Sequence, residues 1–349
     1  MKTKYFLYIA PVLIVFLLSC EKEIKFNGNE VKTKLVLNGL LTPDSVVKIQ
    51  LTASKFFLDM KNGSDFYYLS PDEKEEGNFR RINNAIVELW KNGNKIEELS
   101  NIGKGYYVGT YVPQTGDNLR ITASCEGFDP IECSNEIVTP TPIISIDTMN
   151  FRRDKGYYYQ YSEDGSYYID SSSYYSIISF DMDITFKDPK DIPNYYTINL
   201  YVKYYLANGD SLYSQIAYGS DDMVFHTEND MSFLGDDRNY LKSTLFNDDL
   251  LDGKEYKLKI KIDNYINATA VYWINNESLD VVDVGKEMFV ELQSLSPEFY
   301  MFRKTRDASY NMDETMKYFT EPIQIYSNIE GGLGILGSYS SSFYTIPLK

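Results

Sequence analysis

Histidine is nearly absent from this chain, in which His226 is the only one among 349 residues. A single imidazole excludes a metal site built from several histidines, and a hydrogen-bonded structural role suits His226 better than that of a catalytic base. The sequence also lacks a Gly-x-Ser-x-Gly elbow, a P-loop, a dinucleotide-binding fingerprint and a His-Glu-x-x-His helix. Carboxylate pairs suited to glycoside hydrolysis remain open, because such pairs form in space rather than along the sequence. We therefore expect no enzyme activity and no cofactor.

Positive charge is scarce as well: 34 Lys and Arg residues stand against 50 Asp and Glu residues, which leaves a net charge of -16 at pH 7. A chain this acidic is a poor binder of DNA or RNA phosphates, so we expect no nucleic-acid partner. Aromatic residues, in contrast, are abundant, with 32 tyrosines and 19 phenylalanines. Aromatic side chains suit the half-buried surface of a sheet, so this composition favours strands over helices.

Long apolar runs are limited to one, from Tyr5 to Leu18, which follows Lys2 and Lys4. Its length is that of a signal peptide rather than of a membrane-spanning helix. No later run is long enough to span a bilayer. We therefore expect an exported protein.

The end of this run, Leu17-Leu18-Ser19-Cys20, resembles the lipobox of bacterial lipoproteins, in which the cysteine is acylated and becomes the mature N-terminus. We interpret residues 1–19 as a lipoprotein signal peptide, Cys20 as the lipid attachment site and residues 20–34 as a tether. A secretory signal peptide with an incidental cysteine is the alternative.

Apart from Cys20, the only cysteines are Cys125 and Cys133. Apolar and polar residues alternate on both sides of the turn at 126–130, which predicts a hairpin with both sulfurs on one face. Whether they form a disulfide depends on the register, so a bridge and two buried free thiols remain equal alternatives.

Residues 35–138 have the pattern of a β-sandwich. Alternation predicts strands at 47–53, 85–90 and 105–112, and Asn92-Gly93 is a hairpin turn signal. Short strands with frequent turns are typical of an immunoglobulin-like or transthyretin-like domain. Thr139-Pro140-Thr141-Pro142 then predicts a stiff linker at 139–142.

Residues 143–349 predict a second β-sandwich. Alternating segments at 178–186, 196–204 and 256–262 each have one apolar and one polar face. Ser296 is a good N-cap, with Pro297 in the first helical position, so we expect one helix near 297–310. The fold class is therefore all-β, with two sandwich domains and one helix near the C-terminus of the second.

Two groups of residues are candidates for binding. Asp248, Asp249 and Asp252 are weak candidates for calcium, since Asp252-Gly253 is also an ordinary turn. Tyrosines crowd a stretch rich in Ser, Asp and Gly, where exposed rings offer a large contact area for a ligand or partner. These residues are Tyr157, Tyr158, Tyr159, Tyr161, Tyr167 and Tyr168. The alternative is a long hairpin whose tyrosines cover their own sheet.

Several segments resemble one family of lipoproteins of Bacteroidota, the domain of unknown function 4249. They are Leu35-Val36-Leu37-Asn38-Gly39, Gly105-Tyr106-Tyr107, Phe246-Asn247-Asp248-Asp249, Leu251-Asp252-Gly253-Lys254, Leu292-Gln293-Ser294-Leu295-Ser296-Pro297-Glu298-Phe299-Tyr300 and Ile329-Glu330-Gly331-Gly332-Leu333-Gly334. Residues 156–175 and 221–237 depart from the family pattern and look like insertions. The resemblance implies an outer-membrane partner of a TonB-dependent transporter.

Glu21-Lys22-Glu23 also resembles the acidic signal that exports such lipoproteins to the cell surface. We therefore expect a protein anchored in the outer membrane through Cys20 and facing the exterior. The leading hypothesis is an accessory or ligand-binding component of a TonB-dependent uptake system. A structural or adhesive envelope protein is the second hypothesis, and a carboxylate-dependent hydrolase is the third.

Overall fold

The computed structural model describes residues 32–54, 80–161, 166–206, 208–225, 241, 243–267, 271–274, 277–311 and 323–348. The chain forms two compact units, Met1–Lys32 and Thr33–Lys349, and the fold below is that of the second. The predicted signal peptide, Cys20 and His226 lie outside the described residues. Among the residues that are described, no helix is both long and apolar enough to cross a membrane.

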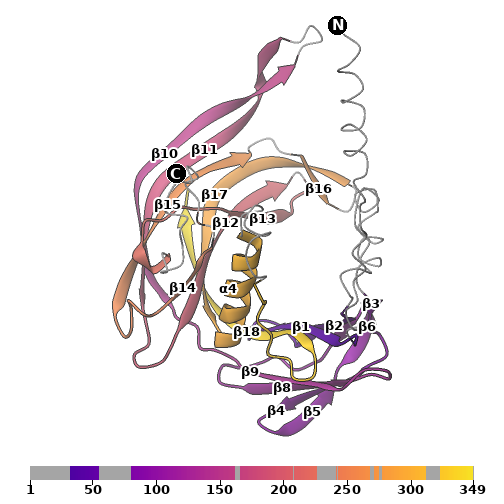
Figure 1. The fold of residues 1–349 in the computed structure, drawn as a ribbon. Helices are drawn as coiled ribbons and strands as arrows, with labels where there is room; N and C mark the ends of the chain where they lie inside the picture. Colours follow the sequence, from indigo (N-terminus) through magenta and orange to yellow (C-terminus); the bar gives the residue numbers. More distant parts are fainter. Residues whose placement is uncertain are drawn as a thin grey trace, which may run out of the picture. The chain divides into compact units, whose positions relative to one another are not determined.

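Strands make up most of this unit, which confirms the predicted all-β class (Figure 1). They are β1 (Leu35–Leu41), β2 (Lys48–Ala53), β3 (Arg80–Arg81), β4 (Ile86–Lys91), β5 (Asn94–Glu98), β6 (Ser100–Gly103), β7 (Tyr106–Val108), β8 (Asn118–Ser124), β9 (Ile131–Glu136), β10 (Ile143–Tyr161), β11 (Tyr167–Lys187), β12 (Tyr195–Leu206), β13 (Ser211–Ile216), β14 (Leu245–Asn247), β15 (Glu255–Asn267), β16 (Val271–Ile274), β17 (Glu277–Leu295) and β18 (Leu333–Pro347). A 3-10 turn, η2 (Met223–Phe225), and helix α4 (Pro297–Asn311) are the described helical elements.

The largest sheet contains strands from both halves of the unit. Eight of its strands lie in the order β13-β12-β17-β18-β1-β2-β7-β6, and β14, β16 and β3 pair beside this row. Strand β18 is shared: its first part, Leu333 to Ser338, pairs in parallel with β1, and its second part, Tyr339 to Pro347, pairs antiparallel with β17. The C-terminal strand therefore holds the two halves together through backbone hydrogen bonds.

Two hydrophobic cores lie on this sheet. The four-stranded sheet β5-β4-β8-β9 packs on β1, β2 and β7, and Leu336 of β18 enters that core. The three-stranded sheet β10-β11-β15 packs on β12 and β17 around Phe180, Leu200 and Val290. The boundary at 139–142 stays a prediction, although Thr141 within it is buried and its N–H donates to the hydroxyl of Ser294 at 3.0 Å.

Local sequence patterns explain many of these elements. Asn92 and Gly93 both have positive φ, as a two-residue hairpin turn of type I′ requires. In β15, Leu258, Ile260 and Ile262 are buried. The alternating lysines of the same strand, at positions 257, 259 and 261, are exposed. The predicted wet and dry faces are thus present.

Helix α4 begins where the sequence predicts. The N–H of Phe299 donates to the Ser296 hydroxyl at 3.2 Å, which is the expected N-cap hydrogen bond. The same hydroxyl accepts the N–H of Ser338 at 3.2 Å, so the cap also attaches the helix to β18. Tyr300 stacks on Tyr195 of β12 with ring centroids 4.5 Å apart. The helix thereby covers the face of the large sheet opposite the three-stranded sheet.

Candidate functional site

The six tyrosines singled out from the sequence all lie in one hairpin, formed by β10 and β11. Their backbones pair across it: Tyr157 lies opposite Tyr174, and Tyr161 lies opposite Tyr167 next to the turn. The third strand of the sheet, β15, pairs with β11 only as far as Tyr175. Among the residues that the structure describes, the hairpin beyond that level consists of two strands, and we call this part the tyrosine ribbon (residues 157–161 and 167–174).

Exposure separates two interpretations of the tyrosine ribbon. Tyr157 is 39% exposed, Tyr168 is 49% exposed and the neighbouring Ile169 is 54% exposed. These three side chains do not cover a core, because a covering role would bury them. The side chains of Tyr158, Tyr159, Tyr161 and Tyr167 lie outside the described ones. The long hairpin of the alternative interpretation is therefore present, but the rings of Tyr157 and Tyr168 on it are exposed.

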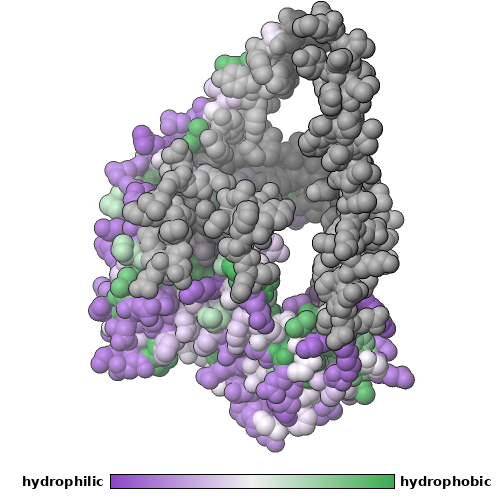
Figure 2. Space-filling view, in the orientation of Figure 1, coloured by the Kyte–Doolittle hydropathy of each residue, from purple (hydrophilic) through white to green (hydrophobic). Residues whose placement is uncertain are grey.

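Exposed apolar side chains also occur elsewhere on the described part of the chain. Figure 2 shows mostly hydrophilic residues over the coloured surface, with hydrophobic residues scattered among them. Ile86, Ile102 and Phe343, each more than half exposed, come from separate strands of the fold. Scattered exposed apolar residues are normal on protein surfaces. On the tyrosine ribbon, three exposed apolar groups lie on a single hairpin.

The three aspartates that are weak calcium candidates stabilise turns. Asp248 accepts the N–H of Asn194 at 2.7 Å, and Asp252 accepts the N–H of Asp191 at 2.8 Å. The Asp249 carboxylate accepts from the side chain of Asn247 at 2.7 Å. Among the residues that the structure describes, no group of three or more His, Cys, Asp or Glu side chains is arranged to hold a metal ion. The carboxylates of Asp248 and Asp252 therefore link their loop to residues 191–194.

A neighbouring acid, Asp188, is almost completely buried. Its carboxylate accepts the hydroxyl of Tyr196 at 2.5 Å and the N–H of Gly253 at 3.0 Å. Burial raises the pKa of this carboxyl, and the negative charges of Asp248 and Asp252 raise it further. The hydroxyl of Tyr196 also lies 3.3 Å from that of Thr141, so Asp188 is connected to the predicted linker.

Of the two alternatives for Cys125 and Cys133, the structure has the free thiols. Register explains why no bridge forms. Cys133 lies opposite Ile121, and Cys125 is four residues further along the other strand, a distance of about 13 Å at 3.3 Å per residue. A disulfide requires Cα atoms within about 7 Å. Cys133 is buried, and this burial raises its pKa to about 12.

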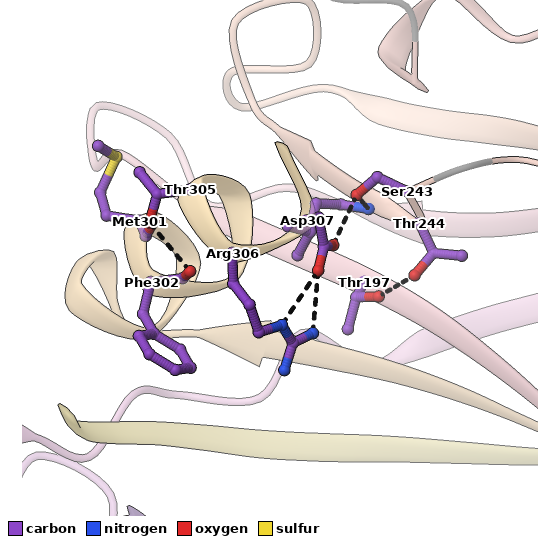
Figure 3. Close-up of polar contacts among 9 residues, drawn as sticks. Thr197, Ser243, Thr244, Met301, Phe302, Thr305, Arg306 and Asp307 are labelled. Atoms are coloured by element: carbon purple, nitrogen blue, oxygen red, sulfur yellow. Dashed lines mark hydrogen bonds and ion pairs between the residues drawn. The ribbon is translucent and has the colours of Figure 1, made fainter. Parts of the chain in front are cut away.

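Polar side chains also meet between α4 and the large sheet, a region that sequence reasoning missed. Figure 3 shows Asp307 of the helix between two donors, the Ser243 hydroxyl at 3.2 Å and the Arg306 guanidinium at 3.0 Å. The hydroxyls of Thr197 and Thr244 lie 2.8 Å apart beside them. The Ser243–Asp307 hydrogen bond joins α4 to the segment before β14, and the Thr197–Thr244 pair joins that segment to β12.

The centre of this polar layer is Glu291, which is only 5% exposed. One carboxylate oxygen accepts from Asn199 at 3.0 Å and from Tyr201 at 3.2 Å. The other accepts from Gln293 at 2.9 Å and from Ser341 at 2.6 Å. Four side-chain donors offset the cost of burying the Glu291 carboxylate, and their hydrogen bonds order the neighbouring strands.

The charges around Glu291 change the ionisation of nearby groups. Burial and the negative Glu291 together raise the pKa of Tyr201 to about 12, so its hydroxyl stays a donor at neutral pH. Burial lowers the pKa of Arg303, one turn before Asp307 on the inner side of the helix. A signal for this layer was present in the sequence, because Asn199 and Glu291 alternate with apolar residues in their strands.

Comparison with known proteins adds one relationship. The model of a family described as a domain of unknown function, DUF4249, matches residues 21–345. No curated protein matches the chain. The matched range includes the tyrosine ribbon and the polar layer around Glu291. It also includes every described strand, except that the last two residues of β18 lie beyond it.

Proposed function

The chain belongs to the DUF4249 family of domains of unknown function, and from this premise we propose that it is a binding protein of the bacterial outer membrane. In this proposal Cys20 carries the lipid anchor and the folded unit faces the exterior. The protein acts as an accessory or ligand-binding component of a TonB-dependent uptake system. It binds a partner and carries out no reaction.

The observation that carries this proposal is the exposed end of the β10–β11 hairpin. Tyr157, Tyr168 and Ile169 present apolar surface to solvent on a ribbon of two strands. Tyrosine loses little conformational entropy on binding and contributes both a flat ring and a hydroxyl. Such residues are enriched at the energetically important positions of protein interfaces. The tyrosine ribbon therefore suits contact with a transporter or with the ligand that it imports.

The non-catalytic part of the proposal is supported by how the buried acids are used. Glu291 is occupied by four side-chain donors, and Asp188 by Tyr196 and the backbone of Gly253. A general acid or base must instead reach a proton on a substrate. Both carboxylates have partners within the fold that account for their burial.

The experiment is purification of the native protein from outer membranes in mild detergent, with identification of what accompanies it. We expect a TonB-dependent transporter in stoichiometric amount, and its loss from a variant with both Tyr157→Ala and Tyr168→Ala. Tyr213→Ala and Tyr310→Ala provide the control, because these tyrosines are more exposed and lie on β13 and α4. Recovery of the lone protein would refute the uptake proposal. Mass spectrometry of the same sample tests the anchor, because an unmodified Cys20 would refute lipidation.

One observation favours the second candidate, a structural or adhesive envelope protein. The shared strand β18 joins both cores in one continuous sheet, as a stiff spacer requires. Binding of the purified protein to whole cells or matrix, without any transporter, would support this role and contradict the first.

A further inference from the structure

Arg303 of α4 is a half-buried cation on the inner side of the helix. Burial lowers the pKa of Arg303, although an arginine stays charged at neutral pH. Within the described part of the chain, its guanidinium contacts the ring of Phe299, but it donates no hydrogen bond and forms no ion pair. Charges that lose part of their contact with water usually have a partner in the fold. The N–H donors of Arg303 are therefore available to an acceptor from outside the chain.

The acids closest to Arg303 have donors of their own. Asp307, whose charge acts more on Arg303 than that of any other described acid, accepts from Ser243 and from Arg306 (Figure 3). Glu291 accepts four hydrogen bonds, two on each carboxylate oxygen. A guanidinium has five N–H donors and no acceptor. The donors of Arg303 are thus in excess in this polar layer.

A second donor in excess is the hydroxyl of Tyr339 on β18. The side chain is half-buried, and among the residues that the structure describes none accepts its hydroxyl hydrogen. Burial and the negative charges of Glu291 and Asp44 raise the pKa of Tyr339, so the hydroxyl stays a donor at neutral pH. Tyr201 differs, because its hydroxyl donates to Glu291 at 3.2 Å.

The two donors lie over the same part of the large sheet. Cζ of Arg303 lies 5.9 Å from the centre of the Phe299 ring, and the centre of the Tyr339 ring lies 6.4 Å from it. The raised pKa of Tyr201 is caused mainly by burial and by Glu291, and the charges of Tyr339 and Arg303 contribute as well. Both groups therefore lie near the Tyr201 hydroxyl, between α4 and the sheet.

This arrangement favours a ligand with anionic oxygens. The planar guanidinium presents two N–H groups side by side, which match two oxygens of a carboxylate or a phosphate. A tyrosine hydroxyl adds a further hydrogen bond. Phe289 of β17 is half-buried and pairs with Tyr201 across the sheet. A flat apolar group attached to the anion can lie against such rings.

We propose that Arg303 and Tyr339 form an anion-binding site between α4 and the large sheet, which binds the carboxylate or phosphate group of a ligand that also has a flat apolar part. The guanidinium binds two oxygens of the anion, and the Tyr339 hydroxyl donates to it. The site goes beyond the proposed function and is distinct from the tyrosine ribbon. Its test needs no transporter, so the failure of either proposal leaves the other standing.

Three probes that share one ring test the ligand chemistry. Benzoate, phenyl phosphate and benzyl alcohol are titrated at millimolar concentration into the purified protein, and binding is followed by calorimetry. We expect at least one of the two anions to bind about tenfold or more tightly than the neutral alcohol, because only an anion forms charge-assisted hydrogen bonds with Arg303. The anion that binds more tightly identifies the source, carboxylate or phosphate. Absence of binding by both anions, or equal affinity for the alcohol, would refute the site.

Substitutions then test the two residues. Arg303→Gln should weaken binding of the preferred anion by about tenfold or more, and Tyr339→Phe by about threefold. Both variants should melt close to the parent, because neither group forms a hydrogen bond with a described residue. Arg306→Gln is the matched control, since Arg306 lies on the same helix and is paired with Asp307. It should bind the anion like the parent.

The variants also separate this site from non-specific attraction by basic residues. An equal loss of affinity in Arg303→Gln and Arg306→Gln would show general attraction and contradict the proposal. Parental affinity in both Arg303→Gln and Tyr339→Phe would contradict it as well. If Arg303→Gln does not fold, Tyr339→Phe decides alone, because it removes a single oxygen atom and keeps the ring that packs on Phe299.

Discussion

Strand β18 belongs to both halves of the sheet, and this predicts that the halves unfold together. Leu292 of β17 is completely buried in the core that β12 and β17 share with the three-stranded sheet. Replacement of Leu292 by Ala should lower the free energy of unfolding by about 2 to 5 kcal/mol, because it removes apolar contacts and leaves a cavity. For a unit of about 300 residues, that cost lowers the melting temperature by about 3 to 8 °C.

The assay uses the small number of tryptophans, which are Trp90 and Trp273. In a Trp273→Phe background the fluorescence reports Trp90, which lies in β4 of the other core. We expect Leu292→Ala to lower the Trp90 midpoint by about the full 3 to 8 °C, although Leu292 belongs to one hydrophobic core and Trp90 lies on a strand of the other. Leu250→Ala is the matched control, because Leu250 is half exposed and should leave the midpoint unchanged. A Trp90 midpoint equal to that of the parent, together with a lowered transition in far-UV circular dichroism, would show independent halves and refute the reasoning.

Three further outcomes follow from the buried polar groups. Burial raises the pKa of Asp188 in the folded chain, so its contribution to stability is present below the ordinary value of about 3.9 and is lost as pH rises through the raised pKa. As pH rises from 4 to 7, the urea midpoint of Asp188→Asn should therefore rise relative to that of the parent. An equal difference between the two midpoints at both pH values would contradict this. Glu291→Gln should lower the free energy of unfolding, measured by chemical denaturation, by about 1 to 3 kcal/mol. The reason is that the new amide nitrogen must face groups that donate to the carboxylate in the parent. Thiol titration should find Cys125 reactive in the folded protein and Cys133 reactive only after unfolding, whereas a single slow phase for both would count against the described burial.

Elements with local signals could be predicted from the sequence. The N-cap Ser296 and the following Pro297 fix the start of α4, because capping involves residues that are adjacent in the chain. The turn at Asn92-Gly93 and the alternation in β15 are local in the same way. A hairpin for the tyrosine-rich stretch was only the alternative interpretation, because its Ser, Asp and Gly residues are also typical of a loop.

The long-range pairings could not be predicted in this way. The parallel pairing of Val36 with Leu333 joins residues almost 300 positions apart, and no local pattern records which distant strand lies beside β1. The disulfide question was open for the same reason, since it depended on the register of Cys133 against Ile121. Glu291 was missed because a polar residue that alternates with apolar ones predicts a solvent-exposed side chain, whereas the structure buries Glu291 among donors from β12 and β18.

These long-range contacts give the β10–β11 hairpin, our proposed binding element, a rigid base. A two-stranded ribbon alone is marginally stable in water, so its exposed tyrosines need a rigid base. That base is the three-stranded sheet, where Phe180 and Ile184 of β11 are buried against the large sheet. Within the large sheet β18 joins β17 to β1, and Glu291 accepts hydrogen bonds from β12 and β18. Loss of the Glu291 network should therefore weaken partner binding only as far as it lowers stability, whereas changes in the tyrosine ribbon should weaken binding in a protein that still melts normally.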